Sequence, residues 1–387
     1  MVKAIKVMLI PNNVQKTKMF QYAGASRFAY NWALAREIEN YEKGGKFLSD
    51  AELRKEFTKL RHSDEYAWLL NISNNVTKQA IKDACTAYKN FFKGLQKFPR
   101  FKSRKRSMPK FYQDNVKIQF SNTHVKFEGF SSSRKANKQK MNWVRLAEHG
   151  RIPTDVKYMN PRISFDGLNW WISVCVEFPD CRETLNDDGV GIDLGIKDLA
   201  VCSDGTKYKN INKSQKVKKL EKQKRRLQRS ISRSYEKNKK GESYCKTNNV
   251  IKKEKLLLKR NHRLTNIRKN YLNQTISEIV NRKPRFICIE DLNVSGMMKN
   301  RHLSKAVQAQ GFFWFRKQLE YRCSDKGIQL IVADRFYPSS KLCSCCGNIK
   351  KDLKLSDRVY RCECGNMIDR DFQASINLKT YGEKFAS

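Results

Sequence analysis

Three acidic residues stand at the ends of apolar stretches, where a charged side chain is costly to bury. Asp193 lies in the apolar run 190–194, Glu290 closes the run that begins at 286, and Asp371 opens an expected C-terminal helix. A buried carboxylate needs a partner or a metal ion. Three converging carboxylates would repel one another without a cation, and Mg²⁺ suits such a site because it takes oxygen ligands and keeps water molecules for a substrate phosphate. Two Mg²⁺ ions, or Mn²⁺ in their place, would activate a water molecule and stabilise the leaving 3′-oxygen of a phosphodiester.

Each acid also has an ordinary explanation. Asp371 could be only a helix N-cap, and Glu290 only the partner of a lysine at a strand end. The order along the chain favours the catalytic interpretation, because an Asp in a first strand and hairpin, a Glu in a later strand and an Asp on a terminal helix follow the RNase H-like plan. The sequence therefore predicts a divalent-metal nuclease domain.

A second candidate metal centre is the cysteine cluster near the C-terminus. Five of the 12 cysteines lie between Cys343 and Cys364, and each of two short clusters ends in Cys-Gly. Clustered thiolates at this spacing are typical of a tetrahedral zinc site, with the expected ligands Cys343, Cys346, Cys362 and Cys364. Each of these short clusters would form one zinc knuckle. The second knuckle has the irregular spacing C-x-C, and Cys345 is an additional cysteine that could replace one of the four ligands. Four thiolates leave no open position, so the zinc ion is expected to be structural.

The first half of the chain is predicted to contain helices inserted between the strands of a β module. A strand is expected at 2–10, and a capping box at Ser49–Glu52 opens one helix. A helical stripe joins Val76, Ala80, Ala84, Tyr88, Phe91 and Leu95. Alternating runs at 116–120 and 170–176 predict antiparallel strands, which we expect to close with the first strand into a small barrel.

The second half has the expected strands 190–194, 199–202, 285–290 and 328–334, followed by the cysteine cluster and the last helix. Between the second and third of these strands lies the basic tract 213–270, with 22 Lys or Arg against 4 Asp or Glu by count along the sequence. Two helices joined by a polar loop near 237–249 fit its apolar spacing. The bias in sign is too large for mutual ion pairing and favours contact with phosphate.

The net charge points to a polyanionic partner. The 387-residue chain has 79 Lys and Arg against 38 Asp and Glu, a formal charge of +41, and a nucleic acid would neutralise this excess with counterion release. No apolar run reaches the roughly 20 residues of a membrane span, so no membrane partner is expected, and the expected location is the cytoplasm, in association with the nucleoid. The candidate contacts lie on one helix face, in the basic and aromatic loop 98–112, and in the basic tract: Asn75, Lys78, Gln79 and Lys82; Arg100, Lys102, Arg104 and Lys105; and Arg225, Arg226 and Arg229.

With these pieces in place, the chain resembles the TnpB family of transposon-encoded, RNA-guided nucleases, which are related to type V CRISPR effectors. The resemblance covers nearly the whole chain and rests on ordered motifs, together with the cysteine cluster and Asp369-Arg370-Asp371: Arg27–Ala35, Pro99–Arg104, Gly191–Gly195, Ile289–Val294 with Gly296–Met298, and Asp334–Lys341.

The resemblance implies a multidomain α+β protein that binds a guide RNA and double-stranded target DNA with a short adjacent motif, and that cuts DNA at one RuvC site. It implies a wedge strand at 1–12, a helical recognition lobe at 13–97, a wedge β-barrel at 98–187, and a RuvC domain at 188–387 with a basic helical insertion at 213–283 and a zinc ribbon at 338–366. The family's catalytic carboxylates carry over to Asp193, Glu290 and Asp371, and the choice of Asp371 over Asp369 rests on the family pattern. The departures are the C-x-C knuckle and Gln373, where Asn is usual.

Several alternatives stay open from the sequence. The guide could come from a transposon end or from a CRISPR array. A non-guided transposase or junction resolvase would share the carboxylates but would leave the N-terminal half without a task. A regulatory DNA-binding protein would keep the zinc ribbon and the basic tract with vestigial carboxylates. Neither a monomer nor a homodimer is favoured.

Overall fold

The computed structural model describes residues 2–130, 140–179, 183–354 and 357–386. The chain forms two compact units, Met1–Pro179 and Asp180–Ser387. None of the helices in these described ranges combines the length and the apolar character of a membrane span.

A seven-stranded sheet forms the framework of the first unit. Its strand order is β2-β6-β7-β1-β5-β4-β3, and all of its ladders are antiparallel. The strands are β1 (Val2–Ile10), β2 (Lys110–Tyr112), β3 (Gln119–Phe120), β4 (His124–Lys126), β5 (Trp143–Leu146), β6 (Tyr158–Phe165) and β7 (Trp170–Glu177). Strand β7 buries every second side chain, as the alternation at 170–176 predicts. The expected barrel is not confirmed, because the described strands form an open sheet whose edges are β2 and β3.

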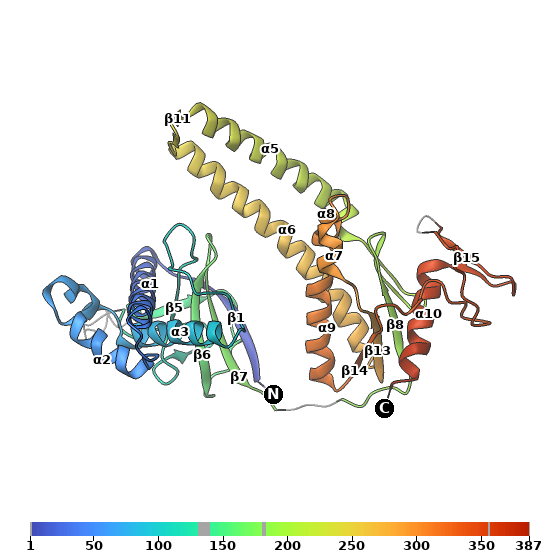
Figure 1. The fold of residues 1–387 in the computed structure, drawn as a ribbon, viewed down its shortest axis with the longest axis horizontal. Helices are drawn as coiled ribbons and strands as arrows, with labels where there is room; N and C mark the ends of the chain where they lie inside the picture. The colour runs from blue at the N-terminus through green and yellow to red at the C-terminus, as the bar shows by residue number, and fades with distance from the viewer. Residues whose placement is uncertain (1, 131–139, 180–182, 355–356, 387) are drawn as a thin grey trace. The chain divides into compact units, whose positions relative to one another are not determined.

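The helices of this unit follow the first strand and precede the second: α1 (Asn13–Glu42), α2 (Asp50–Arg61), the 3₁₀ helix η1 (Asp64–Asn71) and α3 (Asn74–Phe92). Helices α1 and α3 lie side by side and share one core with the sheet (Figure 1). The predicted capping box at Ser49 is present. The predicted stripe holds as far as Tyr88, but α3 ends at Phe92, and Leu95 lies beyond it with 70% of its surface exposed.

The strand expected at 116–120 is wrong over its first half. The Asp114 carboxylate accepts the amide protons of Val116 at 3.0 Å and Lys117 at 3.2 Å, which makes a turn. Val116 is 88% exposed, and only Gln119–Phe120 pairs as a strand. Alternating hydrophobicity over so few residues did not reveal this local competition for backbone amides.

The second unit contains a five-stranded sheet of order β10-β9-β8-β13-β14. Strands β8, β13 and β14 are parallel neighbours, while β9 and β10 continue antiparallel from β8 as a meander. The strands are β8 (Val190–Leu194), β9 (Asp198–Cys202), β10 (Lys207–Lys209), β13 (Phe286–Glu290) and β14 (Gln329–Ala333). They agree with the predicted strands to within one residue at each end where a strand was predicted.

Helices cover both faces of this sheet. On β13, Ile287 and Ile289 share a core with α6 (Asn248–Asn281) and α9 (Phe312–Lys326). The alternate residues Phe286 and Cys288 face the other side, where α10 (Arg370–Glu383) packs. This is why the strand is apolar throughout, as a doubly covered strand must be. The short helices α7 (Val294–Lys299) and α8 (Ser304–Gln310) lead from β13 to α9.

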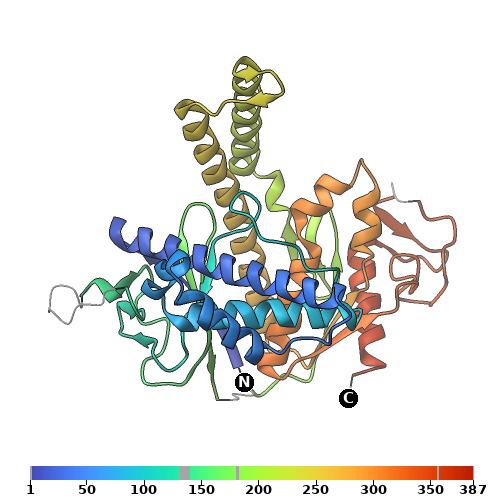
Figure 2. The same ribbon diagram turned by 60° about the vertical axis from the view of Figure 1, so that its left-hand side comes forward.

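The basic tract forms a helical hairpin that projects from the second unit (Figure 2). It consists of α5 (Gln215–Lys237) and α6, joined by the two-stranded β11 (Lys239–Lys240) and β12 (Ser243–Tyr244). Val217 and Leu220 of α5 pack on Leu264 of α6, which is the apolar seam that the sequence predicts. The remaining surface of the hairpin is strongly basic and solvated.

Candidate active site and metal centre

The parallel pair β8–β13 places two carboxylates side by side. Ile192 pairs with Ile289, so Asp193 and Glu290 are the next residues on adjacent strands. Since Ile192 and Ile289 face α6 and α9, alternation directs both acids to the face that α10 covers.

Gly191 allows α10 to approach this face closely. A Cβ atom at Gly191 would lie 2.0 Å from the carbonyl oxygen of Ser375 and 2.4 Å from the amide nitrogen of Lys379. Only glycine leaves room for the helix backbone at this point. Close packing of α10 on β8 therefore fixes the first turn of α10, with Asp371, beside Asp193.

The three carboxylates interact electrostatically. Burial, followed by the charges of Glu290 and Asp371, holds the pKa of Asp193 well above its usual value. Burial also raises the pKa of Glu290, with a contribution from Asp371, although a hydrogen bond from Ser339 partly opposes it. Residues separated by up to 178 positions in the sequence thus form one acidic cluster whose charges disfavour one another.

Asp369 and Asp371 have different roles in the geometry. Asp369 is the N-cap of α10, and its carboxylate accepts the amides of Asp371 and Phe372, both at 3.1 Å. Burial alone would raise the pKa of Asp369, but the Phe372 amide and the charges of Lys207 and Lys197 outweigh it and lower the pKa. Asp371 instead faces the acidic cluster, where it is one of the charges that act on Asp193.

Two further side chains at the cluster were missed as site residues by the sequence reasoning. Ser339 is 4% exposed, and its hydroxyl donates to Oε1 of Glu290. Arg370 donates from Nη2 to Oδ1 of Asp371 at 3.2 Å. Both stand within motifs that carry the family resemblance, and Arg370 is adjacent to Asp371, so proximity in sequence was the available signal.

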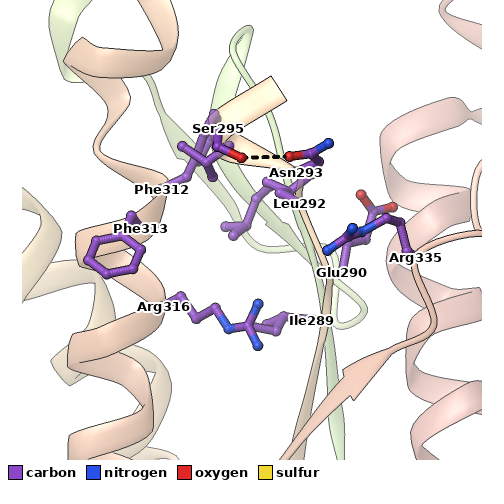
Figure 3. A pocket seen from close by; sticks show the side chains of 11 residues that line it. Ile289, Glu290, Leu292, Asn293, Ser295, Phe312, Phe313, Arg316 and Arg335 are labelled. Carbon is purple, nitrogen blue, oxygen red and sulfur yellow. Dashed lines mark hydrogen bonds between the residues drawn. The ribbon is translucent and has the colours of Figure 1, made fainter. Parts of the chain in front are cut away.

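A pocket of about 240 Å³ opens beside Glu290, between the end of β13 and the start of α9 (Figure 3). Figure 3 shows Arg316 reaching from α9 toward the end of β13, with Arg335 beside Glu290. Both guanidinium groups bind the carboxylate of Asp291, Arg316 at 2.7 Å and Arg335 at 3.0 Å through Nε. The apolar lining includes Phe313, which is 64% exposed. Positive charge and an accessible ring thus adjoin the acidic cluster.

The predicted zinc ligands also come together. The sulfur atoms of Cys343, Cys346, Cys362 and Cys364 all lie within 4.8 Å of one another. The Sγ–Sγ distances are 3.7 Å for Cys343–Cys364 and 3.6 Å for Cys346–Cys362, and ligands at about 2.3 Å from a tetrahedral zinc ion would be about 3.8 Å apart. The four cysteines are therefore compatible with zinc, and the C-x-C knuckle does not prevent their convergence.

The backbone of the two knuckles supports this arrangement. Gly347 and Gly365 adopt φ values of +75° and +88°, and their amides close turns onto the carbonyl groups of Cys343 and Cys362. Burial alone would raise the pKa of Cys343, but backbone amides and Asn366 lower that pKa to about 6, which favours the thiolate. Cys345 is exposed and lies outside the group of four.

The predicted nucleic-acid contacts divide into two groups. Exposed cations are found at Lys78, Lys82, Arg100, Arg104, Lys105, Arg225, Arg226 and Arg229. The amide of Asn75 instead donates to Glu128 at 3.1 Å, and that of Gln79 donates to Asp83 at 2.9 Å. The Lys102 ammonium lies over the ring of Tyr30, and burial lowers its pKa to about 7. These three side chains are engaged within the protein.

Family models match three segments of the chain, and curated relatives match most of its length. Family models match at 1–46 (a helix-turn-helix domain), 173–301 (a probable transposase) and 312–378 (the TNB domain of Cas12f1-like proteins). The chain is 30% identical over 380 residues to "Putative RNA-guided DNA endonuclease InsQ" of Escherichia coli (strain K12), covering 93% of this chain and 87% of that protein. The chain belongs to the TnpB family.

Other comparisons extend this result. The chain is also 29% identical over 382 residues to "Putative RNA-guided DNA endonuclease" of Streptomyces pristinaespiralis, covering 98% of this chain and 89% of that protein. Among solved structures, the fold is similar to that of the Cas12f1 chain in a complex with guide RNA and target DNA, with a TM-score of 0.61, 11% identity and 98% of each chain covered. At that identity the likeness concerns the fold alone.

Proposed function

We propose that this TnpB-family protein is an RNA-guided DNA endonuclease that cuts phosphodiester bonds at one site built from Asp193, Glu290 and Asp371. The observation that carries the proposal is the convergence of these acids from two adjacent strands and a terminal helix, on the face of the sheet that α10 covers. The names of the relatives support the guided form of the reaction.

The second unit is proposed to be a RuvC-type nuclease domain. Its antiparallel meander β10-β9-β8, extended by the parallel strands β13 and β14, has the order expected of an RNase H-like sheet. In the same scheme, 188–387 is the nuclease domain with the insertion 213–283 and the ribbon 338–366. The segments 1–12 and 98–187 supply the wedge β-sheet, and 13–97 the recognition lobe.

The donor set fits divalent metal ions. Burial and the neighbouring negative charges raise the pKa values of Asp193 and Glu290, so these two acids form with Asp371 a costly cluster that a cation would relieve. When bound, two Mg²⁺ or Mn²⁺ ions would supply an activated water molecule and stabilise the leaving oxygen.

Other residues of the chain orient the carboxylates and the substrate phosphate. The Ser339 hydroxyl orients the Glu290 carboxylate, and Arg370 restrains Asp371. Arg316 and Arg335, neutralised in part by Asp291, are placed to hold the backbone of the strand that enters the pocket beside Glu290. Oriented carboxylates and a held phosphate are what an in-line displacement requires.

Zinc is proposed to act as a structural clamp. Four thiolates fill a tetrahedral site and leave no position for a substrate. The second knuckle follows β15 (Val359–Arg361) and precedes β16 (Met367–Asp369), and β16 runs directly into α10. Loss of zinc would therefore loosen the segment that positions Asp371.

A thermal unfolding experiment tests the metal site without relying on activity. Mg²⁺ or Mn²⁺ should raise the melting temperature of the zinc-loaded wild-type protein above its value in buffer without Mg²⁺ or Mn²⁺, because ions that bind only the folded state stabilise it. Asp193→Asn should raise the melting temperature in the buffer without these ions by removing one repelling charge, and should abolish the response to metal. An unchanged metal response in Asp193→Asn would contradict the proposed site.

A second experiment tests guidance. The protein is expressed together with the DNA that flanks its gene, purified, and its bound RNA is sequenced. We expect one defined RNA, and cutting of DNA that matches its guide segment by the wild type but not by Asp193→Ala. Cutting that proceeds after RNA is removed would instead support a non-guided transposase or resolvase, and a CRISPR-derived guide would be recognised from repeat sequence in the RNA.

A further inference from the structure

A pocket of about 590 Å³ lies in the first unit, between α1 and the 3₁₀ helix η1, and none of the described residues that line it has been discussed as a metal ligand. One of its walls is a single face of α1 at helical spacing, formed by Lys18, Gln21, Gly24, Ala25, Phe28 and Asn31. The opposite wall is formed by Trp68, Asn71 and Ile72.

Aromatic rings are available in this pocket. Trp68 is 46% exposed although its indole is in edge contact with Phe28, with the ring centroids 5.7 Å apart. Phe28 is in turn stacked on Tyr66 at 5.5 Å. A large ring that is held from one side and open on the other is a platform on which another planar group can stack.

The wall that carries Trp68 is fixed from within. The buried guanidinium of Arg61 donates from Nη2 to the carbonyl oxygens of Leu69 at 3.1 Å and Ile72 at 3.3 Å. These bonds tie the end of η1 to the end of α2, so the platform is held in place before a ligand arrives. Preorganisation of this kind lowers the entropy cost of binding.

Polar groups at the pocket suit an anionic and hydrogen-bonding ligand. Lys18 and Arg27 are partly buried at the pocket and have no ion-pair partner among the described residues. The exposed amides of Gln21 and Asn71 can donate to or accept from the edge of a heterocycle. The described residues that line the pocket include no carboxylate. The aromatic platform and the amides suit the base of a nucleotide, and the cations suit its phosphate.

We infer that this pocket binds an unpaired nucleotide, with its base stacked on Trp68 and its phosphate near Lys18 and Arg27. The base must be unpaired and unstacked, because a base inside a duplex has both faces covered and cannot reach a platform in a concave site. Guide RNA and the unwound target DNA are the two sources of such a nucleotide for this protein. The inference does not depend on the carboxylate cluster.

Gly24 provides a clean test. It lies inside α1 at the pocket, and an added Cβ atom would meet no atom of the described residues within 4 Å apart from its chain neighbours and the backbone of α1 itself. Gly24→Leu should therefore fill the pocket and, because leucine favours helix over glycine, raise rather than lower the melting temperature. Trp68→Ala removes the platform instead. Thr17→Leu and Tyr41→Ala are matched controls, since both positions are exposed on α1 and neither lines the pocket.

The full chain, freed of bound RNA by nuclease and high salt, is titrated with labelled oligouridine, oligothymidine and a duplex of matched length at several salt concentrations. Gly24→Leu and Trp68→Ala should each weaken single-strand binding by about fivefold or more, since one stacked base contributes at least that factor. Their salt slopes should stay at the wild-type value, because no phosphate contact is removed. Duplex binding, and both control variants, should match the wild type.

The titrations with oligouridine and oligothymidine identify the source of the nucleotide. A loss on oligouridine supports occupation by guide RNA, and a loss on oligothymidine supports occupation by unwound DNA. Wild-type affinity of Gly24→Leu for both single strands would overturn the inference, as would an equal loss on the duplex. If Gly24→Leu disrupted self-association in sedimentation and left every oligonucleotide unaffected, the pocket would be an interface between two copies of the chain, and the inference would again fail.

Discussion

Gln373 and Asn377 lie one turn apart on α10, and both donate a side-chain amide hydrogen to the same carbonyl oxygen, that of Leu342, at 2.7 Å. Leu342 directly precedes the first cysteine of the zinc knuckle. Gln373 also accepts from Ser344 at 2.9 Å, within that knuckle. The helix that carries Asp371 is thus joined to the cysteine cluster through two buried amides.

Gln373→Leu should weaken this junction. The substitution removes one of the two hydrogen bonds to the Leu342 carbonyl and the acceptor of the Ser344 hydroxyl, and one hydrogen bond contributes about 0.5–1.5 kcal/mol to stability. We expect a lower free energy of unfolding and faster release of zinc to a colorimetric chelator. Thr380→Leu, at an exposed position of the same helix, is the control and should behave like the wild type. Equal release rates in the two variants would show that the amide does not link the two sites.

Substitutions of the two aspartates at the start of α10 should have different effects on DNA cutting and on stability. Asp371→Asn should abolish DNA cutting while RNA binding stays near normal. Asp369→Asn should retain cutting, because asparagine is an equally good N-cap, whereas Asp369→Ala should cost about 1 kcal/mol of stability. Cleavage assays and thermal unfolding measure the two effects. Cutting by Asp371→Asn, with loss of cutting in Asp369→Asn, would reverse the assignment.

The cysteines offer an internal comparison. Cys362→Ser should lose zinc and lower the melting temperature, because Cys362 is one of the four convergent sulfurs. Cys345→Ser should keep one zinc ion per chain, because Cys345 is exposed and outside the group. Mass spectrometry of the two purified variants measures their zinc content and tests both expectations. Full zinc occupancy in Cys362→Ser would mean that Cys345 can replace it.

Lys102 should make stability depend on pH. Its pKa is lowered to about 7 by burial, with Lys110 and Arg162 acting in the same direction and Asp83 opposing them. Since the unfolded chain holds this proton up to about pH 10, protonated Lys102 destabilises the fold below pH 7, and the cost diminishes as the pH rises from 7 toward 10. The stability gap between Lys102→Met and the wild type should therefore narrow over that range. A gap that is constant in chemical denaturation across these pH values would contradict the shift.

The convergence of the three carboxylates could be predicted from the sequence because its signals are local. Asp193 and Glu290 interrupt or end apolar runs that can only be buried strands, and parallel strands bring such positions to one edge. The cysteine spacing likewise encodes its own geometry. The residues that complete the site, Ser339 and Arg370, depend on how loops return to the sheet, which hydrophobic periodicity does not report.

The interpretation of polar side chains was weaker for a related reason. Asn75, Gln79 and Lys102 look like solvent-facing polar residues in the sequence, but each is engaged within the protein. Gln79 donates to Asp83 one turn further along the same helix, whereas the partners of Asn75 and Lys102 lie far along the chain. Glu128 is 53 positions from Asn75, and Tyr30 is 72 positions from Lys102 by their numbers. A sequence gives the type of a side chain, but whether a carboxylate already engages it is a tertiary fact.

The exposed cations of α5 and the engaged amides of α3 should therefore differ in nucleic-acid binding. Arg225, Arg226 and Arg229 are exposed on α5. If each contacts a phosphate, changing all three to Gln should reduce the dependence of log Kd on log salt by up to about 0.9 per contact for duplex DNA, and should weaken binding of all sequences alike. Asn75→Ala and Gln79→Ala should instead lower the melting temperature, because each strips a partner from a carboxylate, and should leave the salt slope unchanged. A wild-type slope in the triple variant would exclude this face of α5 from the backbone contacts. Weaker nucleic-acid binding by Gln79→Ala with an unchanged melting temperature would show that the Gln79 side chain touches nucleic acid despite its bond to Asp83.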